Sequence, residues 1–124
     1  MMQLFNTYDN QVQEHDWIVQ NIEYDGFDDF WEKYGRDTNP DFWQKYVRVL
    51  GWLENLGILV KAGLLDIHLI ALSYAGSTRK VWEIVEPTLA DIREKFDYPR
   101  WMSETEYLCK ELIKYMDEHP ELKT

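Results

Sequence analysis

The chain has 124 residues, the size of one ordinary domain, and 45% of them are hydrophobic, which is enough for a buried core. Its six Trp and eight Tyr exclude a disordered chain, because disordered segments are poor in aromatic residues. A formal charge of −10 argues against a nucleic-acid-binding protein, since such proteins contact phosphates through a basic stripe.

Helical periodicity of the apolar residues dominates the chain, and strand-like alternation is almost absent. The first expected helix covers residues 6–22, where apolar side chains recur among polar ones. Gly26 interrupts it, and Asp28 or Asp29 is expected to cap a short second helix that runs through Tyr34. The N-terminal part is therefore expected to hold two helices, of which the first is amphipathic.

The clearest helix start is Asn39 followed by Pro40, because Asn is a good N-cap and proline has no N–H to leave unpaired in the first turn. Apolar residues then recur at three- and four-residue spacing, and Gly63 suits the position just after the helix end. Gly51 and Gly57 lie inside this helix, where each costs up to ~1 kcal/mol relative to Ala. Their presence indicates close helix packing or a local kink.

Two helices are expected after this one. Asp66 is expected to cap a short helix over residues 67–74, which Gly76 ends. Ser77 or Thr78 then opens a long helix with apolar side chains on one face. The sequence thus predicts a helix break at Gly76.

Two further signals lie in the C-terminal half. Pro87 falls inside the long helix and is expected to bend it, because proline cannot donate to the preceding turn. Ser103 and Glu106 form a capping box that is expected to start the last helix. The chain is predicted to be an all-α, single-domain bundle of four or five main helices, with acidic N-terminal helices in residues 1–46 and a core in residues 47–124.

Charge and hydropathy also predict where the protein acts. Residues 1–46 hold ten acidic and three basic side chains, so they carry −7 of the total charge. No apolar run approaches the ~20 residues that span a bilayer, and residues 1–10 lack the features of a secretory signal. The single Cys109 excludes an internal disulfide. We expect a soluble, cytoplasmic protein that binds neither nucleic acid nor anionic membranes.

An ordered set of residues in the C-terminal two thirds carries a family resemblance. The set is Val49-Leu50-Gly51-Trp52-Leu53-Glu54-Asn55-Leu56-Gly57, Gly63-Leu64-Leu65-Asp66, Trp82-Glu83, Pro87, Ile92-Arg93 and Glu106-Tyr107-Leu108. From Val49 onward the chain resembles a family of small prokaryotic proteins catalogued as domain of unknown function 4760. The resemblance implies a helical fold and no established activity. Many members carry an N-terminal membrane-spanning helix. Because the acidic first 46 residues of this chain contain no such helix, the resemblance is not taken to imply that this chain is anchored in a membrane.

Metal and catalytic sites are not predicted. The acidic residues that crowd the N-terminal part are Asp25, Asp28, Asp29, Glu32, Asp37 and Asp41. They lack EF-hand spacing, which favours a solvated acidic face or a surface for a basic partner over a Ca²⁺ or Mg²⁺ site. His15, His68 and His119 are far apart in the sequence, and Cys109 has no base beside it. The sequence therefore predicts no catalytic residue, no metal and no cofactor.

Three residues of the expected helical core are candidates for a ligand pocket: Glu54, Trp82 and Arg93. Glu54 follows the apolar Leu53 and Arg93 follows Ile92, so both charged side chains could point between helices. If Glu54 and Arg93 meet, their ion pair either fixes the helix register or lines a polar pocket for a small ligand. The register role is favoured.

Four aromatic residues are candidates for a protein interface: Phe30, Trp31, Phe42 and Trp43. They form two adjacent pairs, and adjacent side chains on a helix cannot both face one narrow core stripe. Either part of this set is exposed as a patch typical of interfaces, or the N-terminal segment packs over it. The sequence leaves these two alternatives open.

The preferred function is a non-enzymatic interaction module, which uses an aromatic and acidic surface in residues 25–46 to bind another protein or a second copy of itself. The alternative is a small-ligand sensor or an unrecognised enzyme with an inter-helix pocket near Glu54, Trp82 and Arg93. A helix-turn-helix regulator is disfavoured, because residues 64–96 lack a basic recognition face.

Overall fold

A computed structural model describes residues 13–122, and this part of the chain is helical without any strand. The elements are helical residues 13–21, α2 (Gly26–Tyr34), α3 (Pro40–Lys61), α4 (Ile67–Lys95), α5 (Ser103–Glu118) and the short 3-10 helix η1 (Pro120–Leu122). The all-α class is confirmed. The described residues form six helical elements, however, where four or five main helices were expected. The first expected helix lies partly outside the described residues.

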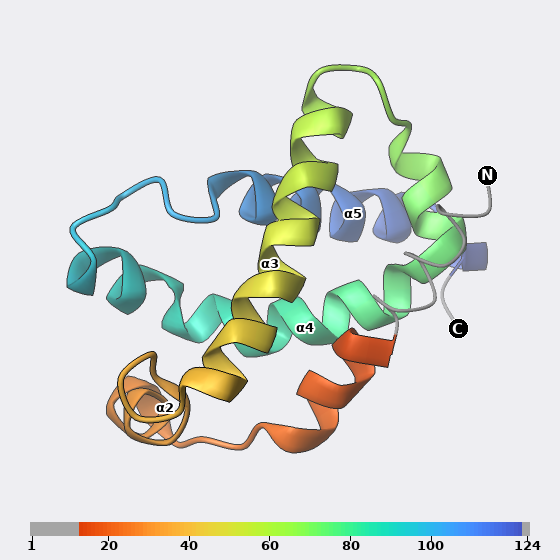
Figure 1. Cartoon of the computed structure of the whole chain (residues 1–124). Helices are drawn as coiled ribbons and strands as arrows, with labels where there is room; N and C mark the ends of the chain where they lie inside the picture. Colours follow the sequence, from red (N-terminus) through yellow and green to blue (C-terminus); the bar gives the residue numbers. More distant parts are fainter. Residues whose placement is uncertain (1–12, 123–124) are drawn as a thin grey trace.

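The long helix α3 crosses the other helices rather than running alongside them (Figure 1). It packs most extensively against α5, and α5 packs in turn against α4. The helical residues 13–21 and α2 lie at one end of α3, whereas the α3–α4 turn lies at its opposite end (Figure 1). The helical residues 13–21 extend along α3 as far as Arg48 and Trp52, so the N-terminal helices pack on the half of α3 that is remote from the α3–α4 turn.

The local signals around α2 and α3 act largely as predicted. α2 begins at Gly26, earlier than a cap at Asp28 or Asp29 would place it, and Asp29 accepts a hydrogen bond from the backbone N–H of Asp25 (2.8 Å). Asn39 caps α3 by accepting from the N–H of Phe42 (3.2 Å). The helix ends at Lys61, followed by Gly63 in the left-handed region (φ 77°), as predicted for a residue beyond the helix end.

The predicted break at Gly76 is wrong, because α4 is one continuous helix from Ile67 to Lys95. Asp66 does cap its start by accepting from the N–H of His68 (2.9 Å). Ala75 and Thr78 flank Gly76 and are both buried, so tertiary packing outweighs the poor helix propensity of glycine. Figure 1 shows α4 changing direction in its green N-terminal part. Gly/Ser pairs commonly permit such bends. The bend expected at Pro87 stays a prediction.

The predicted capping box at the start of α5 is also wrong. Met102 is the residue before the helix, in the left-handed region (φ 55°), and Ser103 is already its first residue. Glu106 points instead to Arg93 and Lys110. The N-terminal N–H groups of α5 therefore need an acceptor from elsewhere in the fold.

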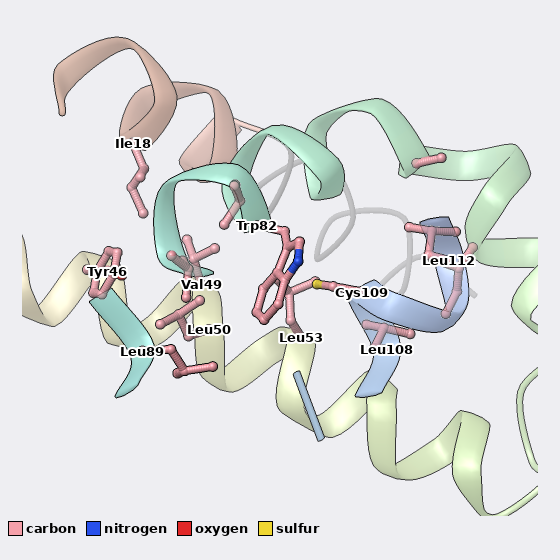
Figure 2. Close-up of a cluster of buried hydrophobic side chains, with 14 of the residues drawn as sticks. Ile18, Tyr46, Val49, Leu50, Leu53, Trp82, Leu89, Leu108, Cys109 and Leu112 are labelled. Carbon is pink, nitrogen blue, oxygen red and sulfur yellow. The ribbon is translucent and has the colours of Figure 1, made fainter. Parts of the chain in front are cut away.

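One hydrophobic core joins all the α-helices. Its fully buried side chains come from α3, α4 and α5, with Ile18 and Phe30 added from the N-terminal helices. Figure 2 shows the α3 residues Tyr46, Val49, Leu50 and Leu53 facing Trp82 and Leu89 of α4 and Leu108, Cys109 and Leu112 of α5. Within residues 13–122, no helix has both the length and the hydropathy of a membrane span.

Candidate functional site

Glu54 of α3 supplies the acceptor that α5 lacks. Its Oε1 lies 2.7 Å from the backbone N of Thr105 and 3.0 Å from the Thr105 hydroxyl. The same hydroxyl lies 3.0 Å from the carbonyl oxygen of Leu50, so it can donate to either oxygen. A carboxylate beside the first turn of a helix is also favoured by the helix dipole. Glu54 thus acts as a cap for α5 from a neighbouring helix.

A glycine brings the two helices close enough for this contact. Gly57 lies one turn after Glu54, and a Cβ placed on it would stand 2.8 Å from the carbonyl carbon of Glu104. Real Cβ atoms do not approach backbone that closely, so only glycine fits here. Of the two explanations that the sequence left open for this residue, the structure supports close helix packing.

Arg93 has its partners on α5 and in the turn before it, and does not pair with Glu54. Its Nη2 lies 3.0 Å from Glu106 Oε1, and its Nε donates to the carbonyl oxygen of Trp101 (2.8 Å). The other carboxylate oxygen of Glu106 pairs with Lys110 (3.0 Å). Burial raises the pKa of Glu106, but the hydrogen bonds from Lys110 and Arg93 outweigh it and hold that pKa below its ordinary value. Arg93 therefore anchors the start of α5 to the end of α4.

The third pocket candidate, Trp82, lies in the hydrophobic core and is only 4% exposed. Figure 2 shows it among core residues of three helices. The structure thus places Glu54, Trp82 and Arg93 in separate environments instead of around one pocket.

Glu54 nevertheless lines an open hollow of about 620 Å³ between the end of α3 and the start of α5. The other lining residues are Ile58, Lys61, Ala62, Tyr98, Arg100, Ser103 and Glu104. Lys61 pairs with Glu104 (3.1 Å), and Glu54 is engaged with Thr105. Three of the four charged residues that line this hollow, Glu54, Lys61 and Glu104, are thus engaged within the chain.

The four interface candidates are largely covered. Phe30, Phe42 and Trp43 are buried, and Trp31 is half-buried. Trp17, on the helical residues 13–21, packs on Phe42 with ring centroids 5.3 Å apart. The sequence left open whether this aromatic region is an exposed patch or is covered by the N-terminal segment. In the described residues, the N-terminal segment packs over it.

An exposed apolar surface lies elsewhere, at the α3–α4 turn. The described chain exposes six large hydrophobic side chains, and five of them fall within residues 58–72. These five, which we call the leucine tip, are Ile58, Leu59, Leu64, Leu69 and Leu72. Leu64 is the most exposed, at 76%. Such clustering is typical of an interaction surface rather than of scattered surface residues.

The leucine tip borders a second open hollow, of about 630 Å³, between the α3–α4 turn and α5. Leu64 and Leu69 line it together with half-buried residues of the turn, with Asp66, and with Tyr107 and Glu111 of α5. Lys61 lies over the Tyr107 ring, 4.9 Å from its centroid. Two of the five side chains of the leucine tip thus line a recess.

A signal for the leucine tip was present in the sequence. Ile58, Leu59 and Val60 are three consecutive apolar residues on a helix, so they cannot all face one core stripe. This run therefore predicts an exposed apolar face, as the adjacent aromatic pairs do.

The tip also differs from the rest of the chain in charge. Residues 55–78 contain one Lys, Lys61, and one Asp, Asp66, so their formal charge is zero. The whole −10 therefore falls on the remaining residues. Five of the six exposed large hydrophobic side chains of the described residues thus lie in a segment without net charge.

Two histidines that are distant in the sequence meet around one tyrosine. His68 Nδ1 is hydrogen-bonded to the hydroxyl of Tyr115, and His119 stacks on the Tyr115 ring with centroids 4.2 Å apart. Desolvation and the Asp66 and Glu121 carboxylates raise the pKa of Tyr115. Among the described residues, no three His, Cys, Asp or Glu side chains are grouped so as to hold a metal ion.

Cys109 is expected to be unreactive in the native protein. It is 1% exposed, and burial, with a smaller effect of the Glu86 charge, raises its pKa to about 12. Only the thiolate attacks alkylating reagents. At pH 8 we expect iodoacetamide to modify native Cys109 roughly a thousandfold more slowly than the denatured chain, because the thiolate fraction falls in that proportion when the pKa rises from 9.0 to about 12. Intact-mass measurements with and without urea check this, and equal rates in both conditions would contradict it.

Comparison with known proteins identifies the family of this chain. The family model described as "Domain of unknown function (DUF4760)" matches residues 2–112. The chain belongs to this family. The match begins well before Val49, where the resemblance noted in the sequence starts, so the family domain includes the acidic N-terminal part. No curated protein and no solved structure matches the chain.

Proposed function

We propose that this member of the DUF4760 family is a non-enzymatic protein-interaction module whose binding surface is the leucine tip. The observation that carries the proposal is the gathering of five of the six exposed large hydrophobic side chains of the described chain at the α3–α4 turn. Exposed apolar clusters of this kind, beside a recess, provide the buried centre of protein interfaces. The proposal moves the interface from residues 25–46 to residues 58–72.

The small-ligand alternative has less support. The hollow beside Glu54 is open, and its charged residues Lys61 and Glu104 are paired with each other. Ligand pockets are usually apolar cavities with a few convergent polar groups. The Glu54–Thr105 contact is better explained as a helix cap that fixes the register of α3 and α5.

Removing the apolar side chains of the tip should abolish partner binding without unfolding the protein. The test variant is Leu64→Ser with Leu69→Ser, and the matched control is Tyr98→Ser, which changes the one exposed large hydrophobic residue that the described part of the chain has outside the tip. Tagged proteins would be used to capture partners from a native cell lysate, with mass spectrometry as the readout. We expect partners retained by the wild type and the control to be lost from the double variant.

Thermal unfolding of all three proteins provides the stability control, because exposed substitutions usually change stability by less than about 0.5 kcal/mol. Partners that remain bound to a folded double variant would contradict the leucine tip as the interface.

A further inference from the structure

We infer that the partner of the leucine tip is a second copy of this chain, bound tip to tip about a two-fold axis. This inference rests on the proposed function, because it names the occupant of the same surface. Closed two-fold dimers are the commonest assemblies of soluble proteins.

The charge distribution supports a second copy in this arrangement. Each copy carries −10, so two copies repel each other through most of their surfaces. Residues 55–78 have no net charge, whereas residues 1–46 carry −7. The described part of this acidic segment, residues 13–46, holds nine acidic and three basic side chains and packs on the half of α3 that is remote from the α3–α4 turn, reaching Arg48 and Trp52 (Figure 1). A tip-to-tip contact therefore joins two neutral segments and keeps residues 13–46 of both copies outside the contact.

The tip is also self-complementary, as a two-fold contact requires. In such a contact, residue i of one copy meets residue j of the other, and the reverse contact forms as well. The uncharged centre holds Leu64, Leu69 and Leu72, whose exposed side chains can pack on their counterparts. The single base and the single acid of residues 55–78 are engaged within their own chain, since Lys61 pairs with Glu104 and Asp66 caps α4, so the contact is mainly apolar.

The recess beside the leucine tip can receive side chains from the second copy. The hollow of about 630 Å³ is lined by Leu64, Leu69 and Tyr107, which are residues of both the turn and α5. An apolar side chain of the second copy that enters this open hollow would contact these three residues, and the lining also includes Asp66 and Glu111. Interface anchors are typically held in such pockets, surrounded by a polar rim.

The first experiment measures the mass of the full chain by sedimentation equilibrium over a range of concentrations, at about 0.05 and 0.5 M salt. We expect a monomer–dimer equilibrium whose Kd falls at the higher salt, because screening reduces the repulsion between two −10 chains. Leu69→Glu should weaken the dimer roughly tenfold or more, since it brings like charges together at the centre of the contact. Tyr98→Glu is the matched control and should leave Kd nearly unchanged.

A cross-linking variant tests the geometry independently of affinity. Leu69→Cys places an accessible thiol on the tip, whereas the native Cys109 is buried. We expect mild oxidation to join two Leu69→Cys chains through a disulfide and to leave a Tyr98→Cys control monomeric. An equilibrium dimer that Leu69→Glu does not weaken and that Leu69→Cys does not cross-link would overturn the tip-to-tip arrangement.

A wild-type chain that stays monomeric at all concentrations and salts would overturn the inference of a second copy. If the tip variants of that monomer still lose a different captured protein, the proposed function stands and the tip belongs to a heterologous partner. If nothing depends on the tip in either experiment, both the inference and the proposed function fail.

Discussion

Replacing Gly57 by Ala is expected to be among the most destabilising single-methyl changes in this protein. The added Cβ would overlap the carbonyl group of Glu104, and a backbone group cannot move aside as a flexible side chain can. α3 and α5 would have to separate, which would disturb the contact of Glu54 with Thr105 one turn away. We expect a loss of about 3 kcal/mol in the free energy of unfolding, at the upper end of the usual cost of overpacking.

Gly51→Ala is the matched control, because it makes the same change in the same helix. A Cβ on Gly51 meets no atom within 4 Å, so only the helix propensity changes. Alanine should then stabilise the protein by up to about 1 kcal/mol. Urea denaturation followed by circular dichroism measures both variants. Similar effects of Gly51→Ala and Gly57→Ala would show that the α3–α5 approach is not as close as the structure indicates.

The helix boundaries that the sequence predicted are those set by neighbouring residues. Asn39 and Pro40 start α3, Gly63 follows its end, and Asp66 caps α4, all through contacts within a few residues. The predicted break at Gly76 failed because a local propensity of about 1 kcal/mol competes with the packing of buried neighbours on both sides.

The start of α5 could not be predicted for a different reason. Ser103 and Glu106 have the spacing of a capping box, but the acceptor for the Thr105 N–H is Glu54, 51 positions earlier in the chain. Glu106 is drawn away by Arg93, with which it forms an ion pair. Sequence spacing contains no information about such a partner unless the crossing of α3 and α5 is already known.

The four aromatic interface candidates show the same difference between a local sequence signal and the tertiary contacts that decide burial. The sequence indicates that adjacent apolar residues on a helix cannot share one narrow stripe, but it does not show whether other elements cover them. Phe42 and Trp43 are both buried because α3 is covered on two sides there, by Trp17 on one and by Phe96 and Trp101 on the other. At the other end of α3 the described residues provide no such cover for the leucine tip, which remains exposed.

Replacing Glu54 by Ala should destabilise the protein by about 2 kcal/mol, because the N–H of Thr105 then loses its acceptor in a largely buried place. Glu54→Gln keeps an acceptor oxygen and should cost less. The exposed neighbour Asn55 provides the control, since Asn55→Ala should change stability by less than about 0.5 kcal/mol. Urea denaturation measures all three, and equal effects at Glu54 and Asn55 would contradict the capping role.

A double-mutant cycle then separates the cap from a general effect of removing Glu54. Thr105→Val replaces the hydroxyl by a methyl group of similar size and removes its contacts with Glu54 and Leu50, while the backbone N–H remains. Because both side chains share one contact, the double variant should be less destabilised than the sum of the single variants, by about 1 kcal/mol. Additive effects would mean that the two side chains act independently. Glu54 would then cap α5 through the backbone N–H of Thr105 alone, and the junction of α3 and α5 beside the leucine tip would depend on that bond and on the packing around Gly57.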